Sequence, residues 1–418
     1  MKVHFGRSAG LVAAALSAVV LAAGCASGAS GEDGGGDTRA LGPEKAAAGA
    51  PVKIGWISTG QTQANDTTDE IRGAEAVVAY ANARLGGIGG RPIELVTCEE
   101  KGTPAGAQDC GNRMVSEGVS AVAAGSSGQA DPWIEIAHAA GIPVGINFAS
   151  TKLVLGTPNV FVFGNPLGAH GTPAAFAREN GLAGAAMLVI DVPAASGPAK
   201  ALAPGFFANA GAAAEVVAVP PGTADMTPQV QAAQARNPRM YHILGDETFC
   251  TSAIKAIRTL GIQAPITAID RCVGPNGSAS IPGGYENVEA IAQANTNPDD
   301  GEFKIYEAVV EEYGPDGLEL NPNSASGYQG ILSLVRAVNA SGTTDLTPKG
   351  VSAAIAAAPA VPYPLGGGGT FQCNGTAVPA ISKNICSKTS FLADITEDGT
   401  LTSFRTLDTT GIYEAPKS

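Results

Sequence analysis

The chain has 418 residues and a formal net charge of −13 at pH 7. A chain of this length is too long for one compact core and is typical of two domains. The acidic balance argues against nucleic acid as a partner and against a basic surface that docks on a membrane.

Residues 1–24 have the pattern of a secretory signal. Lys2 and Arg7 precede an apolar run that ends in small residues just before Cys25, and this run is too short to span a membrane. A cysteine at this place resembles the lipobox of bacterial lipoproteins, which implies that Cys25 is the first mature residue and carries lipid. The alternative is an ordinary secreted protein with a chance cysteine. Residues 25–51 have almost no large apolar side chains and predict a flexible tether.

Cysteine usage is typical of an oxidising compartment. Six cysteines remain when the lipidation site is set aside, and an even number there indicates disulfides, although the sequence alone leaves their connectivity open. We expect the pairs that are nearest in sequence, namely Cys98–Cys110, Cys250–Cys272 and Cys373–Cys386. Because no metal-ligand spacing occurs and the histidines are scattered, we expect neither a metal nor another cofactor.

Strands and helices alternate after the tether. Apolar runs predict strands at 52–58, 91–97, 119–124 and 142–147. Periodic segments predict a helix that begins near Thr67 and ends at Gly86, and further helices at 104–117 and 132–140. This alternation predicts a parallel sheet with helices on both faces.

The pattern restarts after a change between Phe161 and Phe176. The second set of predicted strands is 185–191, 214–219, 240–244 and 265–269, and the helices between them are 199–209, 227–235 and 252–259. A helix-rich stretch follows at 301–357, and the tail has strand-like runs at 391–395 and 401–406. The fold class is therefore α/β, with two doubly wound lobes in tandem.

The loops after the strands are the expected ligand site, because ligands of open parallel sheets bind beyond the carboxyl ends of the strands. In the first lobe this rule selects 58–65, 125–129 and 149–151, and in the second lobe it selects 191–197, 245–248 and 270–271. Their glycines and hydroxyl side chains at helix starts suit a carboxylate. The alternative is plain helix capping, which the same residue types provide.

Three charged residues of the second lobe are further candidates. The adjacent carboxylates Asp246 and Glu247 could bind an ammonium group or act as general acid and base, or they could be ordinary acids of a first helical turn. Arg271 could pair with a ligand carboxylate, could pair with Asp246, or could be an ordinary surface residue.

Enzyme templates do not fit this sequence. Gly125–Gly128 is not the Gly-x-Ser-x-Gly motif, and only His170, in the crossover region, lies near a strand end where a Ser–His–Asp set would need one. The glycines at 86–90 follow a helix rather than a strand, so they are no dinucleotide fingerprint. We therefore expect a binding protein and not an enzyme.

Several segments in order carry a family resemblance. They are Val52-Lys-Ile-Gly-Trp, Asn82-x-x-x-Gly-Gly-Ile-x-Gly-Arg-Pro-Ile93, Gly125-Ser-Ser-Gly-Gln, Gly141-Ile-Pro-Val144 and Lys255-Ala-Ile-Arg-x-Leu-Gly261. Together they resemble the branched-chain amino acid (Leu/Ile/Val-type) substrate-binding proteins of ABC importers, in the periplasmic-binding-protein type I family. The resemblance implies two Rossmann-like lobes joined by three crossovers, which close on a ligand like a flytrap. Lobe 1 would comprise 52–165 with 298–362, and lobe 2 would comprise 166–297 with 363–418.

The resemblance also assigns roles to the strand-end loops. Ser126, Ser127 and Gly128 would meet the acidic end of the ligand, and the same wall would continue through Ala149, Ser150 and Thr151. Asn65 would lie over the ligand, and 245–247 would close on it from the second lobe. Two departures stand out: amino acid binders often have a tyrosine around the position of Ala195 or Ser196 and an acid that grips the ammonium around the position of Arg271, and these three positions hold other residues.

The implied function is that of a monomeric extracytoplasmic lipoprotein, anchored to the outer face of the cell membrane through Cys25. It would deliver a small polar organic solute, such as an amino acid, an amide or a small carboxylate, to an ABC permease and its ATPase subunits. The alternative is a receptor-like ligand sensor with the same fold.

Overall fold

The computed structural model describes residues 38–62 and 66–414. The predicted signal at 1–24, the lipidation site Cys25, tether residues 25–37 and the candidate Asn65 lie outside these ranges. Among the helices of the described ranges, none combines the length and the apolar character that crossing a bilayer requires.

The first sheet is parallel throughout, with the strand order β2-β1-β3-β4-β5. Its strands are β1 (Val52–Ser58), β2 (Ile93–Glu99), β3 (Ala121–Ser126), β4 (Val144–Phe148) and β5 (Val160–Val162). The helices that follow strands β1 to β4 are α1 (Thr68–Tyr80), α2 (Pro104–Glu117), α3 (Ala130–Ala139) and α4 (Lys152–Gly156). A short π-helical turn, η2 (Ala81–Leu85), extends α1.

Both faces of this sheet are covered, as the side chains of β1 illustrate. Ile54 and Trp56 pack in one core with α1 and with a helix from much later in the chain, α11 (Pro322–Ser341). Ile57 packs on the opposite face, in a second core with α2 and α3. Because the strand is buried on both sides, its sequence is a nearly continuous apolar run rather than an alternating one.

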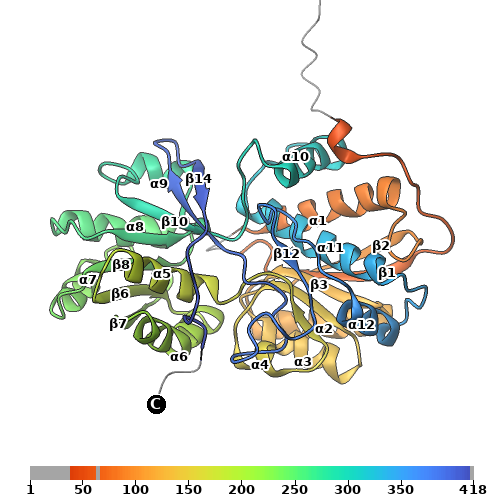
Figure 1. The fold of residues 1–418 in the computed structure, drawn as a ribbon, viewed down its shortest axis with the longest axis horizontal. Helices are drawn as coiled ribbons and strands as arrows, with labels where there is room; N and C mark the ends of the chain where they lie inside the picture. The colour runs from red at the N-terminus through yellow and green to blue at the C-terminus, as the bar shows by residue number, and fades with distance from the viewer. Residues whose placement is uncertain (1–37, 63–65, 415–418) are drawn as a thin grey trace, which may run out of the picture. The chain divides into compact units, whose positions relative to one another are not determined.

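The second sheet is mixed, with the strand order β14-β13-β10-β9-β8-β6-β7. Its parallel strands are β6 (Gly184–Ile190), β7 (Ala213–Val219), β8 (Met240–Leu244), β9 (Ile266–Ile269) and β10 (Val288–Ala292). Two strands from the end of the chain, β13 (Phe391–Ile395) and β14 (Leu401–Arg405), add to it antiparallel. β13 pairs with β10, and β14, blue in Figure 1, forms the edge of the sheet.

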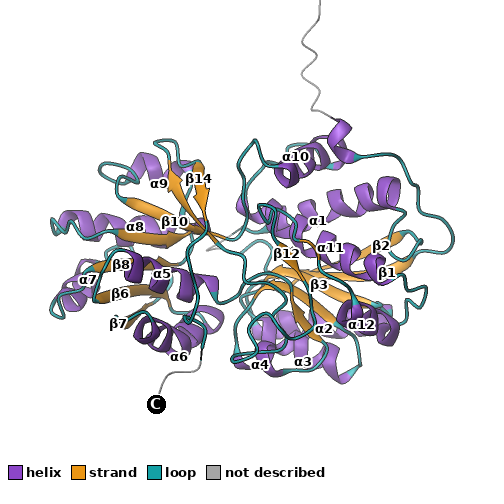
Figure 2. Cartoon of the chain, viewed as in Figure 1, coloured by secondary structure: helices purple, strands orange, loops and turns teal. Residues whose placement is uncertain are grey.

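Helices also cover both faces of the second sheet (Figure 2). Met187 of β6 packs with α5 (Gly168–Glu179) and α6 (Pro193–Asn209). The next residue, Leu188, packs on the other face with α7 (Thr227–Gln234) and α8 (Glu247–Thr259). The shorter elements η3 (Asp270–Cys272) and α9 (Pro275–Ser280) follow β9.

The chain passes between the two lobes three times, as the resemblance implies. It leaves the first sheet between β5 and α5 and returns between β10 and α10 (Gly301–Tyr313). After α11, α12 (Pro348–Ala357) and the small pair β11 (Val361–Pro362) and β12 (Thr370–Phe371), it passes back to the second sheet at β13. The α/β prediction of two doubly wound lobes is confirmed.

The three predicted disulfides are confirmed as Cys98–Cys110, Cys250–Cys272 and Cys373–Cys386. The predicted strands and helices are also found, with shifts of a few residues at their ends. The largest shifts are in α6 and α8, which begin six and five residues before the predicted starts at 199 and 252. The sequence prediction did not include β5, α5 or β10, nor the short elements α4, α9 and β11.

Candidate functional site

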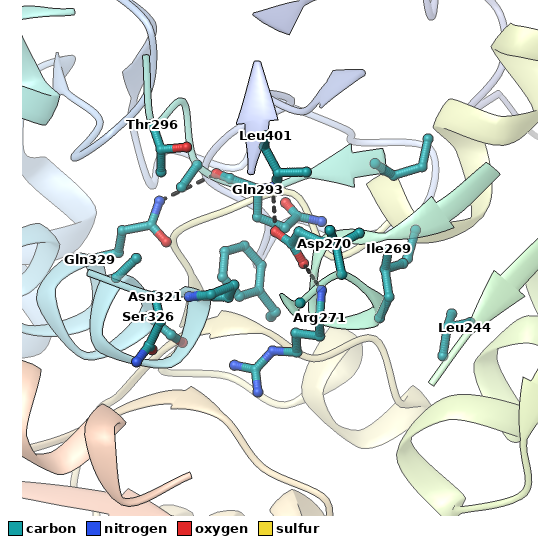
Figure 3. A pocket seen from close by; sticks show the side chains of 18 of the residues that line it. Leu244, Ile269, Asp270, Arg271, Gln293, Thr296, Asn321, Ser326, Gln329 and Leu401 are labelled. Carbon is teal, nitrogen blue, oxygen red and sulfur yellow. Dashed lines mark hydrogen bonds between the residues drawn. The ribbon is translucent and has the colours of Figure 1, made fainter. Parts of the chain in front are cut away.

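A cavity of about 780 Å³ lies between the two sheets and takes its walls from both lobes. Most of the lining side chains are apolar, among them Phe148, Val192, Leu244, Ile269 and Phe303. Figure 3 shows polar side chains from distant segments facing the same space. A mainly apolar cavity with a few convergent polar groups is the usual form of a small-molecule site.

Most of the predicted first-lobe residues line this space. Ser127, Gly128, Ala149 and Ser150 are in the wall of the cavity. Thr151 lines an adjoining cavity of about 600 Å³, whose wall also includes Gly128 and Ser150. The strand-end rule therefore selected residues that line these cavities.

The hydroxyl group of Ser127 is committed to bonds inside the protein. It donates to Oε2 of Glu100 at 2.6 Å and accepts from the indole nitrogen of Trp133 at 3.1 Å. Oε1 of Glu100 accepts from the Thr59 hydroxyl at 3.0 Å and from the backbone N–H of Gln129 at 3.1 Å. An internal carboxylate thus occupies the start of α3, where the resemblance places the acidic end of the ligand.

Glu100 is fully buried, and burial raises the pKa of its carboxyl group, while the hydrogen bond from Ser127 opposes this rise. Thr151 also has a local role, since its hydroxyl caps α4 through the backbone N–H of Val154 at 3.2 Å and donates to Asp131 at 2.5 Å. These hydroxyls therefore fix the loops of the first-lobe wall.

Asp246 and Glu247 do not line either cavity. The carboxylate of Asp246 accepts from the backbone N–H of Phe249 at 2.9 Å and caps α8. The carboxylate of Glu247 accepts from the backbone N–H of Gly277 at 2.7 Å. Both acids thus serve the local structure of the second lobe, which was the alternative considered for them.

Arg271 lines the cavity. Pairing with Asp246 was one of the three alternatives for it, but its partner in the structure is Glu70. Its guanidinium donates to Oε1 of Glu70 at 2.6 Å and to Oδ1 of Asn323 at 2.9 Å. Glu70 lies in the first turn of α1 and Asn323 in the first turn of α11, so this cluster joins the second lobe to the first. The Glu70 side chain is fully buried, whereas that of Arg271 is partly exposed.

Further polar residues line the cavity that were not singled out as ligand-binding, among them His170, Gln293 and Ser326. Asp270, which belongs to the predicted loop 270–271, lines it as well. Asp270 accepts from the backbone N–H of Arg271 at 2.8 Å and of Gln293 at 3.1 Å, and burial raises the pKa of its carboxyl group. Gln293 directly follows β10, so a correct prediction of that strand would have selected it. Ser326 and His170 lie within helices α11 and α5, and the strand-end rule does not reach them.

Within the described ranges, no group of three or more His, Cys, Asp or Glu side chains is placed to hold a metal ion. The arrangement therefore offers a cavity, fixed hydrogen-bonding groups and an ion pair that joins the lobes.

Comparisons with known proteins agree with this geometry. A family model described as periplasmic binding protein matches residues 51–382, while a comparison with curated protein sequences finds no match. Solved structures with the same fold include a fatty acid ABC transporter substrate-binding protein from Thermomonospora curvata, with 16% identity, a TM-score of 0.70, and coverage of 88% of this chain and 96% of that chain.

Two other similar structures differ in what their titles name as ligand. One is a leucine binding protein from Thermotoga maritima, with 18% identity, a TM-score of 0.64, and coverage of 85% of this chain and 98% of that chain. The other is an ABC transporter solute binding protein from R. palustris in complex with 4-hydroxybenzoate, with 19% identity, a TM-score of 0.66, and coverage of 86% and 96%.

Proposed function

Because this chain belongs to the periplasmic binding protein family, we propose that it is an extracytoplasmic solute-binding protein that delivers a small organic solute to an ABC permease and its ATPase subunits. The observation that carries this proposal is the cavity of about 780 Å³ with walls from both lobes. A ligand held there contacts both halves at once, so its binding favours the closed arrangement over an open one.

The similar structures support this function through their ligands. Their titles name solutes of ABC transporters, among them a fatty acid and 4-hydroxybenzoate. At such low sequence identity they support the fold and the class of function, whereas the choice of solute depends on the residues of this cavity.

The proposal includes parts that depend on the sequence pattern alone. Lipid on Cys25 would hold the protein at the outer face of the membrane, and the mature protein would act as a monomer without catalysis. The lobes would comprise 52–165 with 298–362, and 166–297 with 363–418.

The experiment that tests this function starts from the mature protein purified from an oxidising compartment. Mass spectrometry of the denatured protein should release an unmodified small molecule, and thermal unfolding should shift upward when that molecule is added back. The absence of any bound molecule, together with no thermal shift across amino acids, amides, alcohols and carboxylates, would contradict the proposed function.

A further inference from the structure

The charges around the main cavity are a property that the proposed function leaves open. Arg271 is the lining arginine, and the described residues of this wall include no lysine. Its guanidinium is bound to the buried carboxylate of Glu70 at 2.6 Å, and Asn323 takes a second N–H group. Figure 3 shows the side chain of Arg271 pointing away from Asp270 and Gln293. The positive charge of the wall is therefore already compensated inside the protein.

The other charged lining groups are acids. Asp270 lies in the wall, and Glu319 and Asp398 are exposed side chains of the same lining. The donors at the start of α3 are also taken, because Glu100 accepts from Ser127 and from the backbone N–H of Gln129. A carboxylate that entered this cavity would give up its hydration without meeting an uncompensated cation among the described lining residues.

Uncharged hydrogen-bonding groups, in contrast, have no partner within the protein. They are Nδ1 of His170, Oγ of Ser326 and Oε1 of Gln293. The side chains of His170 and Ser326 are each only 2% exposed, and a buried polar atom without a partner costs stability unless something binds to it. Burial lowers the pKa of His170 to about 4, so its imidazole is neutral at physiological pH.

We infer that the ligand is an uncharged, mainly apolar molecule with hydroxyl or amide groups, and that carboxylates are rejected. This inference rests on the proposed function and names the chemical class that the cavity takes. The apolar walls bind the body of the ligand, and its hydroxyl or amide groups bond to Ser326, Gln293 and His170 after these buried side chains rotate toward the cavity. Acids are excluded because the buried carboxylate of Glu70 already compensates the positive charge of Arg271. A ligand carboxylate therefore finds no uncompensated cation at this wall.

Matched pairs of compounds test this selectivity on the wild-type protein. Isothermal titration should compare benzyl alcohol with benzoate, 4-hydroxybenzamide with 4-hydroxybenzoate, and octan-1-ol with octanoate. We expect the uncharged member of at least one pair to bind at least about tenfold more tightly than its carboxylate. Carboxylates that bind as tightly as their partners, or more tightly, would overturn the inference and leave the proposed function intact. Failure of every compound to bind would count against both proposals.

The variant Glu70→Gln tests the cause of the selectivity. Removing the buried charge frees the guanidinium of Arg271, so the affinity for the carboxylate of each pair should rise about tenfold relative to the affinity for its uncharged partner. The ratio of the two affinities is the measurement, because a change in lobe closure affects both members of a pair. The double variant Glu70→Gln/Arg271→Gln is the matched control and should lose this gain. An unchanged preference in Glu70→Gln would contradict the role of the ion pair, and the wild-type comparison decides the ligand class even if this variant does not fold.

Discussion

Two buried histidines lie close together in the second lobe and have unsatisfied ring nitrogens. His170 of α5 lines the cavity, and His242 of β8 is bonded through Nδ1 to the Thr267 hydroxyl at 2.9 Å. Burial lowers the pKa of His170 to about 4 and that of His242 to about 3, and for His242 the neighbouring His170 adds to the effect. Both imidazoles therefore stay neutral in the folded protein where free histidines would be protonated.

These histidines predict a loss of stability in mild acid. Below the ordinary pKa of 6.5, the unfolded chain binds protons that the folded protein excludes, so the free energy of unfolding should fall by about 1.4 kcal/mol per pH unit for each histidine. For His170 this loss ends near its folded pKa of about 4. Glu100 and Asp270 act in the opposite sense, because their raised pKa values let the folded protein bind protons first.

Comparison of variants isolates the histidine contribution. Between pH 7 and pH 5, the free energy of unfolding measured in urea should fall less for His170→Phe than for the wild type. The difference between the two losses should reach about 2 kcal/mol at pH 5. His138→Gln changes an exposed histidine of α3 and should keep the wild-type slope. Parallel curves for all three proteins would contradict the assignment.

At the scale of elements, the crossing of α1 and α11 positions the groups that join the lobes. The two helices lie side by side in Figure 1 although they are far apart in sequence. A Cβ on Gly327 would lie 2.0 Å from the carbonyl oxygen of Glu70, and one on Gly73 would lie 2.3 Å from that of Ser324. Glycine at both positions is thus required by the close approach of the two backbones, which brings Glu70 and Asn323 toward Arg271.

The substitution Gly327→Ala should therefore destabilise the protein even though alanine is the better helix former. Because the added methyl forces α11 away from α1, we expect a loss of about 2 kcal/mol in urea unfolding. Gly197→Ala is the matched control, since Gly197 lies inside α6 with no atom near its missing side chain, and it should leave stability unchanged or raise it by up to about 1 kcal/mol. Equal stability of the two variants would show that the helix crossing tolerates a side chain.

The sequence predicted the elements whose burial leaves a clear pattern. The runs that became β1 and β8 are apolar and bounded by polar residues, so they could be recognised. The strand β5 is only three residues long. Helix α5 contains Pro173 and two glycines, so it depends on tertiary packing rather than on propensity.

The candidate site was predictable only where it follows strands. Ser127, Ala149 and Arg271 lie at strand ends, and the structure brings them to one cavity. That Glu100 fills the start of α3, or that Glu70 meets Arg271, depends on contacts between distant segments for which a single sequence contains no pattern. The residue types at the strand ends thus located the cavity but did not reveal which of their hydrogen bonds were already used.

At the scale of the whole molecule, the Arg271–Glu70 pair is a contact between the lobes that needs no ligand. Removing one member of a buried ion pair leaves the other without compensation, which is strongly unfavourable unless water can reach it. Opening of the lobes gives water that access. In the wild type, Arg271 compensates Glu70 without any opening, and separation of the lobes would break this contact. The intact pair should therefore favour a closed arrangement of the ligand-free protein.

Solution X-ray scattering tests this expectation. The ligand-free variant Arg271→Ala should have a larger radius of gyration than the wild type, because its lobes separate to hydrate Glu70. Arg405→Ala is the control, since Arg405 pairs with Glu179 and Glu289 inside the second lobe, and it should scatter like the wild type. Identical scattering of all three proteins would show that the pair does not influence closure.

The packing of α11 on α1 has a consequence for biosynthesis. The apolar face made by β1 and α1 is completed by residues 322–341, so a ribosome must add about two hundred and forty residues after α1 before that face can be covered. In the nascent chain, the core that β1 and α1 share with α11 therefore cannot form until synthesis reaches α11. This core of the first lobe is thus completed only late in synthesis.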